Sequence, residues 1–263
     1  MADDHDAFMQ ALADQNLSDE RKDEIRKLHE MFGPEELRDD LKEYLSEREG
    51  GMVMMHHPLY VSNFYAPTLN RQINRSIAAK EKAVEEARAR GDWGLILGLH
   101  ERPYRMQAFK SLQNEMTDAE FWSDVSWLWT DSENIWQHIA DWRRVWRSKR
   151  PGRDTVMDDD ERAKLESLPD VIEVFRGTYV WPHMDRGLSW TLDRDKAVWF
   201  AYRYKPEHYS PWVVSGKIRK KNVIAYFDGR SEQEIVLLPE RLITDSSKVE
   251  ELPAKREKLA IPG

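Results

Sequence analysis

The spacing of apolar residues changes once along this 263-residue chain, near residue 170. Before that point apolar side chains recur at helical intervals, as in residues 71–90 and 118–150. After it come short apolar runs of strand length, with one helical segment at 193–204 between them. The runs cover residues 171–177, 187–192, 212–218, 222–227 and 234–239. A helical first part followed by clustered strands predicts an α+β protein.

The first fifth of the chain carries the net negative charge. Residues 1–50 hold 16 acidic and 7 basic residues, whereas the other 213 residues hold 32 and 33. Residues 18–32 and 33–47 each show one apolar helical face, and Gly50-Gly51 provides a break after them. The pattern predicts an acidic helical hairpin, and it leaves open whether this hairpin is a lid, a docking arm or a solvated surface.

Three segments therefore make up the predicted organisation. They are an acidic helical arm at 1–50, a helical region at 51–165 and a β-rich core at 166–263. In the middle segment Trp122, Trp129 and Trp136 recur every seven residues, a spacing typical of a buried helical face.

Composition indicates a folded cytoplasmic protein. The chain has 11 Trp and no Cys, which excludes disulfides and thiolate zinc sites and suits a reducing compartment. No apolar stretch approaches the length of a membrane span, and the acidic start is unlike a secretory signal. His56 and His57 are adjacent, so their side chains point apart, and no third ligand is near. We expect neither a membrane span nor a metal site.

Polar residues stand at the ends of three predicted strands, where packing alone does not require them. They are Arg176, then Ser189 with Thr191, then Glu232 with Glu234. Residues i and i+2 of a strand share a face, so the two carboxylates would point the same way and repel each other unless a cation meets them. If the strands are neighbours, the three groups converge. The competing interpretation is an ordinary cross-strand ion pair among plain strand residues.

In their order and strand contexts these motifs resemble the Arg-Ser-Glu clade of NAD-dependent mono-ADP-ribosyltransferases. The likeness covers about residues 170–245 and includes the helix "DRDKAVWFAYRY" after the Ser motif. It implies that residues 166–263 form an ADP-ribosyltransferase fold of two small packed β-sheets with flanking helices. It also implies NAD+ as substrate and a toxin or effector of bacterium–phage conflict, with an antitoxin as a possible partner.

The resemblance assigns roles to individual residues. Glu234 would stabilise the ribosyl cation, Ser189 would position Glu234 and the ribose, and Arg176 would hold the NAD+ diphosphate. Thr191 would brace the strands, and backbone groups of Gly177 would bind the nicotinamide amide, since a residue without Cβ lets a ligand come close. An aromatic residue would stack on the nicotinamide ring. The candidates are Tyr204, Tyr209 and Trp212.

The acceptor of ADP-ribose is the open question. In the family, a Glu at the position of Glu232 is associated with arginine acceptors. Basic residues interleaved with Trp142 and Trp146 favour RNA, although cations at a helix C-terminus are also good electrostatics. These residues are Arg143, Arg144, Arg147 and Arg150. We lean slightly to RNA over protein arginine. An NAD glycohydrolase and a non-catalytic binding module also stay open as hypotheses.

Overall fold

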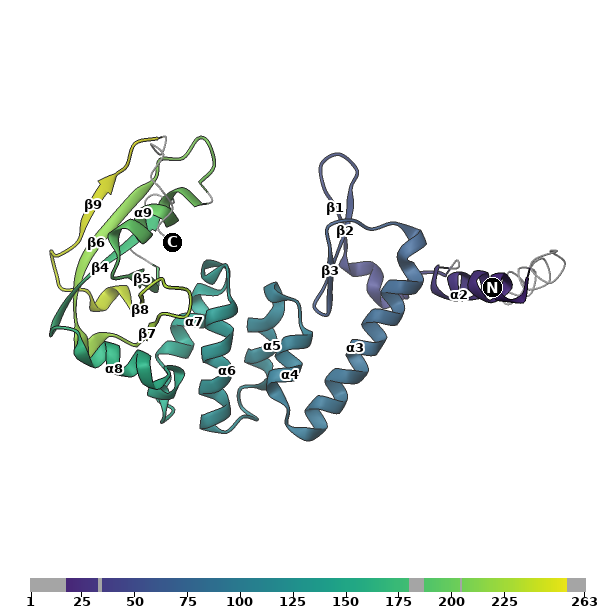
Figure 1. Cartoon of the computed structure of the whole chain (residues 1–263), viewed down its shortest axis with the longest axis horizontal. Coiled ribbons are helices and arrows are strands. Elements are labelled where there is room, and N and C mark those ends of the chain that lie inside the picture. The colour runs from purple at the N-terminus through teal and green to yellow at the C-terminus, as the bar shows by residue number, and fades with distance from the viewer. Residues whose placement is uncertain (1–17, 33–34, 180–186, 204, 255–263) are drawn as a thin grey trace. The chain divides into compact units, whose positions relative to one another are not determined.

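The computed structural model describes residues 18–32, 35–179, 187–203 and 205–254. The chain divides into two compact units, residues 1–116 and 117–263. Each unit combines helices with an antiparallel sheet (Figure 1), as the α+β class requires. The division falls inside the predicted helical region, because the helices after residue 117 pack with the C-terminal strands. None of the helices in the described ranges is long and apolar enough to cross a membrane.

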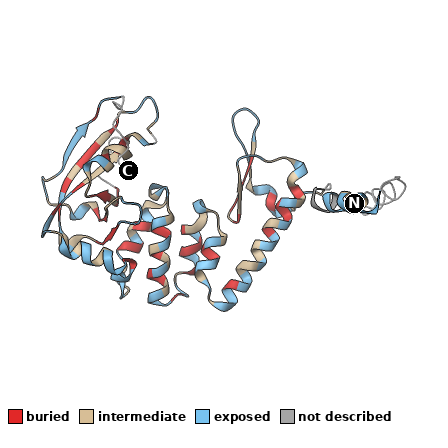
Figure 2. Cartoon of the chain, viewed as in Figure 1, coloured by how far each residue is buried: buried red, intermediate tan, exposed pale blue. Residues whose placement is uncertain are grey.

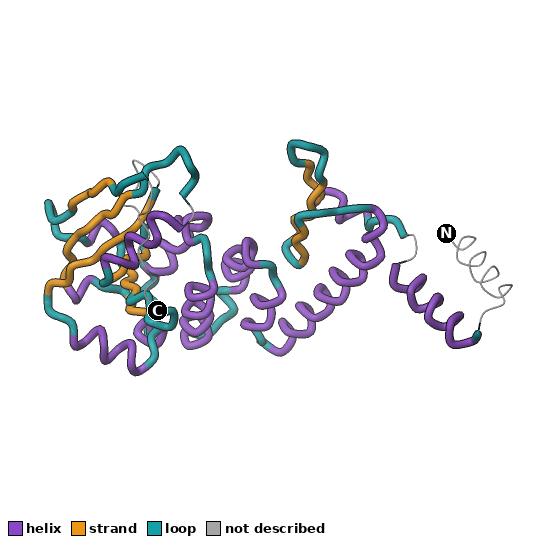
Figure 3. The backbone as a smooth tube through the Cα atoms, turned by 45° about the horizontal axis from the view of Figure 1, so that its top comes forward, coloured by secondary structure: helices purple, strands orange, loops and turns teal. Residues whose placement is uncertain are grey.

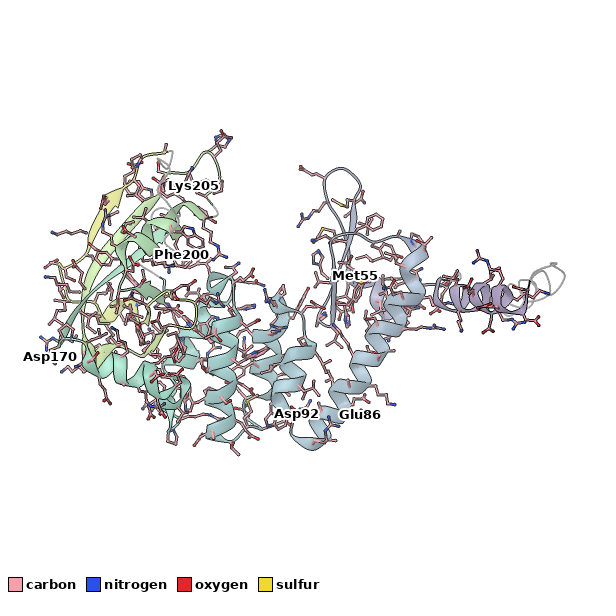
Figure 4. All side chains as sticks on the ribbon, viewed as in Figure 1. Met55, Glu86, Asp92, Asp170, Phe200 and Lys205 are labelled. Atoms are coloured by element: carbon pink, nitrogen blue, oxygen red, sulfur yellow. The ribbon has the colours of Figure 1, made fainter. Side chains whose placement is uncertain are left out.

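The first unit is built around one long helix, α3 (Asn70–Arg90). This helix ends at Gly91, which adopts the left-handed conformation that closes a helix C-terminus. Its buried Ile73 and Ile77 pack with Met55 of strand β2 (Figure 4). The other elements are α2 (Asp19–Phe32), η1 (Asp39–Tyr44), β1 (Leu45–Glu47), β2 (Val53–His57), β3 (Tyr60–Ser62), η2 (Pro67–Leu69), α4 (Trp93–Leu99), η3 (Arg102–Tyr104) and α5 (Arg105–Leu112).

The helix predicted over residues 33–47 is wrong for its described part, residues 35–47. Its place is taken by η1 and by β1, which pairs antiparallel with β2. Gly50 and Gly51 have φ of 97° and 76°, so they form the turn of this hairpin and do not simply separate two segments. The four-residue spacing identified Leu37 and Leu41 as buried, whereas Leu45 is half-buried and pairs with Met55 of β2 in an extended conformation.

The second unit opens with helices. Helix α6 (Asp118–Asp131) starts at a capping box, in which Thr117 accepts a hydrogen bond from the Glu120 N–H and the Glu120 carboxylate accepts one from the Thr117 N–H. The helical pattern breaks at Ser132 and resumes in η4 (Ile135–His138) and α7 (Ile139–Trp146). Then follow η5 (Arg153–Val156) and α8 (Asp159–Ser167).

The described strands of this unit form one antiparallel sheet in the order β7-β8-β5-β4-β6-β9. Its longest strands are β4 and β6 (Figure 3). The strands are β4 (Val171–Thr178), β5 (Ser189–Thr191), β6 (Trp212–Arg219), β7 (Ala225–Phe227), β8 (Glu234–Val236) and β9 (Lys248–Glu251). The sequence did not predict β9, because its four residues are all exposed and show no apolar alternation (Figure 2).

The described strands of this unit form one continuous sheet with two halves, and not the predicted pair of small packed sheets. β4, β6 and β9 form one half, and β5, β8 and β7 form the other. A single residue pair, Phe175 with Thr191, joins β4 to β5. The two halves are therefore joined by this short junction.

Helix α9 (Arg194–Arg203) covers one face of the first half. Its Ala197 and Ala201 are fully buried and pack with Val213 of β6. The approach is very close at β4, because a Cβ on Gly177 would lie 1.8 Å from the backbone oxygen of Ala197. Gly177 is thus the residue that lets α9 lie directly on the strand.

Candidate active site

A cavity of about 480 Å³ lies where the two halves of the sheet join. It is lined by β4, β5, the start of β8, the segment between α6 and α7, and α9, from which Phe200 contributes (Figure 4). Its lining includes the predicted Arg176, Gly177, Ser189, Thr191, Glu232 and Glu234. The three motifs that the sequence predicted to converge therefore do so.

Arg176 reaches the cavity through the alternation of β4. Ile172 and Val174 are buried on one face of the strand, and Arg176 is the next residue on that face. Its Nη1 donates a hydrogen bond to the Ser189 backbone oxygen at 2.6 Å. Burial lowers the pKa of Arg176 to about 10, while the nearby Glu234 acts in the opposite direction. The guanidinium therefore remains charged at neutral pH.

Gly187 makes room for that guanidinium, a role that no sequence pattern indicates. A Cβ on Gly187 would lie 2.1 Å from Cζ of Arg176. Arg176 Nε is buried without a hydrogen-bond partner among the described residues. With Nη1 bound to Ser189, the guanidinium does not present its whole fork of donors to the cavity.

Glu234 is the first residue of β8 and pairs in register with Thr191. Trp129 of α6 donates a hydrogen bond from Nε1 to Glu234 Oε2 at 3.2 Å. Burial raises the pKa of Glu234, whereas hydrogen bonds from Ser189 and Trp129 lower it and the neighbouring Glu232 raises it further. The carboxylate is thus a partly desolvated group with two donors on it.

Glu232 precedes β8, so the prediction that Glu232 and Glu234 lie on one face of the same strand is wrong. Ser231 and Gln233 on either side of it have φ of 52° and 45°, in the left-handed region that residues other than glycine rarely adopt. The loop is held by Thr191 Oγ1, which donates to the Glu232 backbone oxygen at 2.6 Å. Asp228 Oδ1 also accepts the Gln233 N–H at 3.1 Å. Strained turns of this kind cluster at functional sites, and this one brings Glu232 to the cavity.

The competing interpretation was an ordinary cross-strand ion pair between Arg176 and one of the two carboxylates. In the described ranges, Arg176 forms no ion pair with Glu232 or Glu234. The cavity therefore holds a cation and two carboxylates that do not neutralise one another by direct contact.

Two cavity residues have structural tasks of their own. Thr191 Oγ1 accepts the Asp193 N–H at 3.0 Å in addition to donating to Glu232, which agrees with its predicted bracing role. The backbone of Gly177 lines the cavity, but its missing Cβ is required by α9. Helix packing is therefore a second reason for a glycine there, beside the predicted close approach of a ligand.

The two predicted stacking aromatics that the structure describes, Tyr209 and Trp212, are not part of the lining. Tyr204 lies outside the described residues. Tyr209 is 53% exposed and meets Tyr179 edge-on at 6.0 Å, and neither Tyr209 nor Trp212 lines the cavity. The aromatic residues that do line it are Trp136, Phe175, Tyr179, Trp190 and Phe200. Trp136 is 46% exposed, so its predicted place in a buried face is wrong.

The four arginines proposed to bind RNA have carboxylate partners in their own unit. Glu240 pairs with both Arg143 and Arg147. Arg144 lies 3.0 Å from Asp141, and Arg150 lies 3.4 Å from Asp118. These contacts give the segment an intramolecular role, while Arg144 and Arg147 stay 70% and 52% exposed, so RNA binding by this segment stays a prediction.

Comparisons with family models, curated proteins and solved structures find no match to this chain.

Proposed function

We propose that this protein is an NAD+-dependent ADP-ribosyltransferase. The observation that carries the proposal is Glu234, a carboxylate held by Ser189 and Trp129 in a cavity that also contains the Arg176 guanidinium. The order of the three motifs along the chain, which resembles the Arg-Ser-Glu clade, supports the same assignment.

The proposed reaction breaks the bond between ribose C1′ and the nicotinamide nitrogen. The bonding electron pair leaves with nicotinamide, and positive charge develops on the ribose, as in glycoside cleavage. An ionised Glu234 beside C1′ stabilises this charge from a partly desolvated position. The acceptor nitrogen then bonds to C1′, and its proton passes to Glu232 or to water.

Arg176 supplies the positive charge for the NAD+ phosphates. It remains protonated at neutral pH, and its remaining donor capacity faces a cavity that it shares with the carboxylates. Its cation also limits the repulsion between Glu232 and Glu234.

For the acceptor, the geometry favours a guanidinium on a protein over RNA. Glu232 lies at the cavity with Glu234, where a second carboxylate can orient and deprotonate a poorly nucleophilic nitrogen. The ion pairs of the four arginines give the basic segment an intramolecular explanation, which weakens one of the two arguments for RNA. RNA stays the second candidate, because the likeness to phage-defence enzymes still supports it.

Incubation of the protein with adenine-labelled NAD+ and a bacterial lysate tests both points, with Glu234→Gln as the inactive control. We expect label on a polymer that protease removes and ribonuclease does not. Label removed only by ribonuclease would make RNA the acceptor. Free ADP-ribose without labelled polymer would identify a glycohydrolase, and unchanged NAD+ would overturn the proposal.

Gly187→Ala is expected to raise the KM for NAD+ about 10-fold, because its Cβ would displace the Arg176 guanidinium from a position 2.1 Å away. The displaced atoms end a flexible side chain, so the free energy of unfolding should fall by less than about 1 kcal/mol. Nicotinamide release and urea unfolding measure the two effects. Gly229→Ala is the control, since a Cβ there meets nothing within 4 Å. An unchanged KM in Gly187→Ala would remove Arg176 from NAD+ binding.

A further inference from the structure

We infer that Trp129 of helix α6 is a positioning residue for Glu234: its indole N–H holds one carboxylate oxygen so that the other is directed at the substrate. The inference rests on the proposed function. The seven-residue spacing of Trp129 with Trp122 and Trp136 predicted only that its ring is buried, and Trp129 is 2% exposed. The structure adds a polar contact that this spacing does not reveal.

The contact joins residues 105 positions apart in the sequence, from Trp129 Nε1 to Glu234 Oε2 at 3.2 Å. Nε1 is the single hydrogen-bonding atom of an indole and can only donate. Trp129 therefore serves Glu234 as a fixed donor that takes no part in proton transfer.

Neighbouring rings fix the orientation of that donor. Trp142 and Trp146 of α7 meet the Trp129 ring edge-on, with centroids 5.0 and 5.3 Å away and interplanar angles of 88° and 76°. Rotation of the Trp129 ring would have to displace both of them. The N–H is thus held in place before any substrate binds.

The segment of helix α7, which carries Trp142 and Trp146, also forms ion pairs with the chain just beyond Glu234. Arg143 of α7 and Arg147, the residue that follows α7, both pair with Glu240 in η8 (Pro239–Arg241), shortly after β8 ends. The aromatic cluster therefore contacts Glu234 through Trp129, and the neighbouring arginines contact Glu240 a few residues after the strand. The basic segment that the sequence suggested for RNA is part of this support.

Burial alone does not explain the contact. The Nε1 of Trp146 in the same cluster is buried without a hydrogen-bond partner among the described residues. The fold therefore tolerates a buried indole N–H without an acceptor here. The hydrogen bond from Trp129 lowers the pKa of Glu234, whereas burial raises it. The contact therefore favours the ionised carboxylate that the reaction needs.

Trp129→Phe removes the donor and keeps an aromatic ring. We expect kcat for nicotinamide release to fall about 10- to 100-fold with KM for NAD+ nearly unchanged, and the acid limb of the pH–rate profile to move to higher pH.

Trp122→Phe is the matched control. Trp122 lies on the same helix and is fully buried, and the substitution removes the 2.8 Å hydrogen bond from its Nε1 to the Pro151 backbone oxygen. It should destabilise the fold without moving the pH profile. Equal kinetic losses in the two variants, or an unmoved acid limb in Trp129→Phe, would overturn the inference.

An NMR titration separates this inference from the proposed function. The indole ¹⁵N–¹H signal of Trp129, assigned by its loss in Trp129→Phe, should shift with pH as Glu234 ionises, and the shift should vanish in Glu234→Gln. This titration without any NAD+ cleavage would uphold the contact and reject the proposed function. NAD+ cleavage without this titration would reject the role of Trp129 alone.

Discussion

Glu234→Gln is expected to lower the rate of NAD+ cleavage by about 100- to 1,000-fold, because the amide cannot offset the positive charge that develops on the ribose. The same change should raise the melting temperature at pH 7. The pKa of Glu234 is raised by burial in the folded protein, so the folded state binds its proton more tightly than the unfolded state does. The ionised carboxylate therefore destabilises the fold at neutral pH, and this effect disappears below the ordinary pKa of a glutamate.

Nicotinamide release and thermal melts at pH 7 and pH 4 measure these opposite effects. The stability gain should be present at pH 7 and absent at pH 4. Glu232→Gln, the same substitution two residues earlier, serves as the comparison. It should retain nicotinamide release and lose transfer to the polymer. If instead it abolishes release while Glu234→Gln does not, the roles of the two carboxylates are exchanged.

The convergence of the site could be predicted because strand alternation is a local rule. Ile172 and Val174 mark the face on which Arg176 follows, and the strand containing Ser189 is a short apolar run with a polar start. The order of the strands then places Ser189 on the neighbour of the strand that carries Glu234, and Arg176 on the next strand across. What alternation could not predict is the loop at Glu232, where two left-handed residues replace the expected strand.

Other features depend on partners far along the chain. The seven-residue spacing of Trp129 indicates a buried ring, but the acceptor of its N–H lies on β8. Likewise, the charges of Arg143 and Arg147 are visible in the sequence, whereas their shared partner Glu240 is not. A basic segment thus resembles a binding surface until the carboxylates that neutralise it are known.

Gly177→Ala is expected to lower the free energy of unfolding by about 3 kcal/mol or more, since overpacking against rigid atoms is costly. The new Cβ would lie 1.8 Å from the backbone oxygen of Ala197 and 2.6 Å from the backbone nitrogen of Ala201. Because both belong to the backbone of α9, no rotamer change relieves the clash, and the whole helix must move off β4. Urea unfolding followed by circular dichroism measures the loss.

Gly229→Ala again provides the control, and its stability should stay within about 0.5 kcal/mol of the parent protein. The comparison also decides between two explanations for the glycine at 177. A large loss of stability assigns it to the packing of α9, because the clash exists without any ligand. A variant as stable as the parent that binds NAD+ weakly would instead return Gly177 to the ligand role that the family resemblance implies, and α9 could then not lie on β4 as closely as this structure has it.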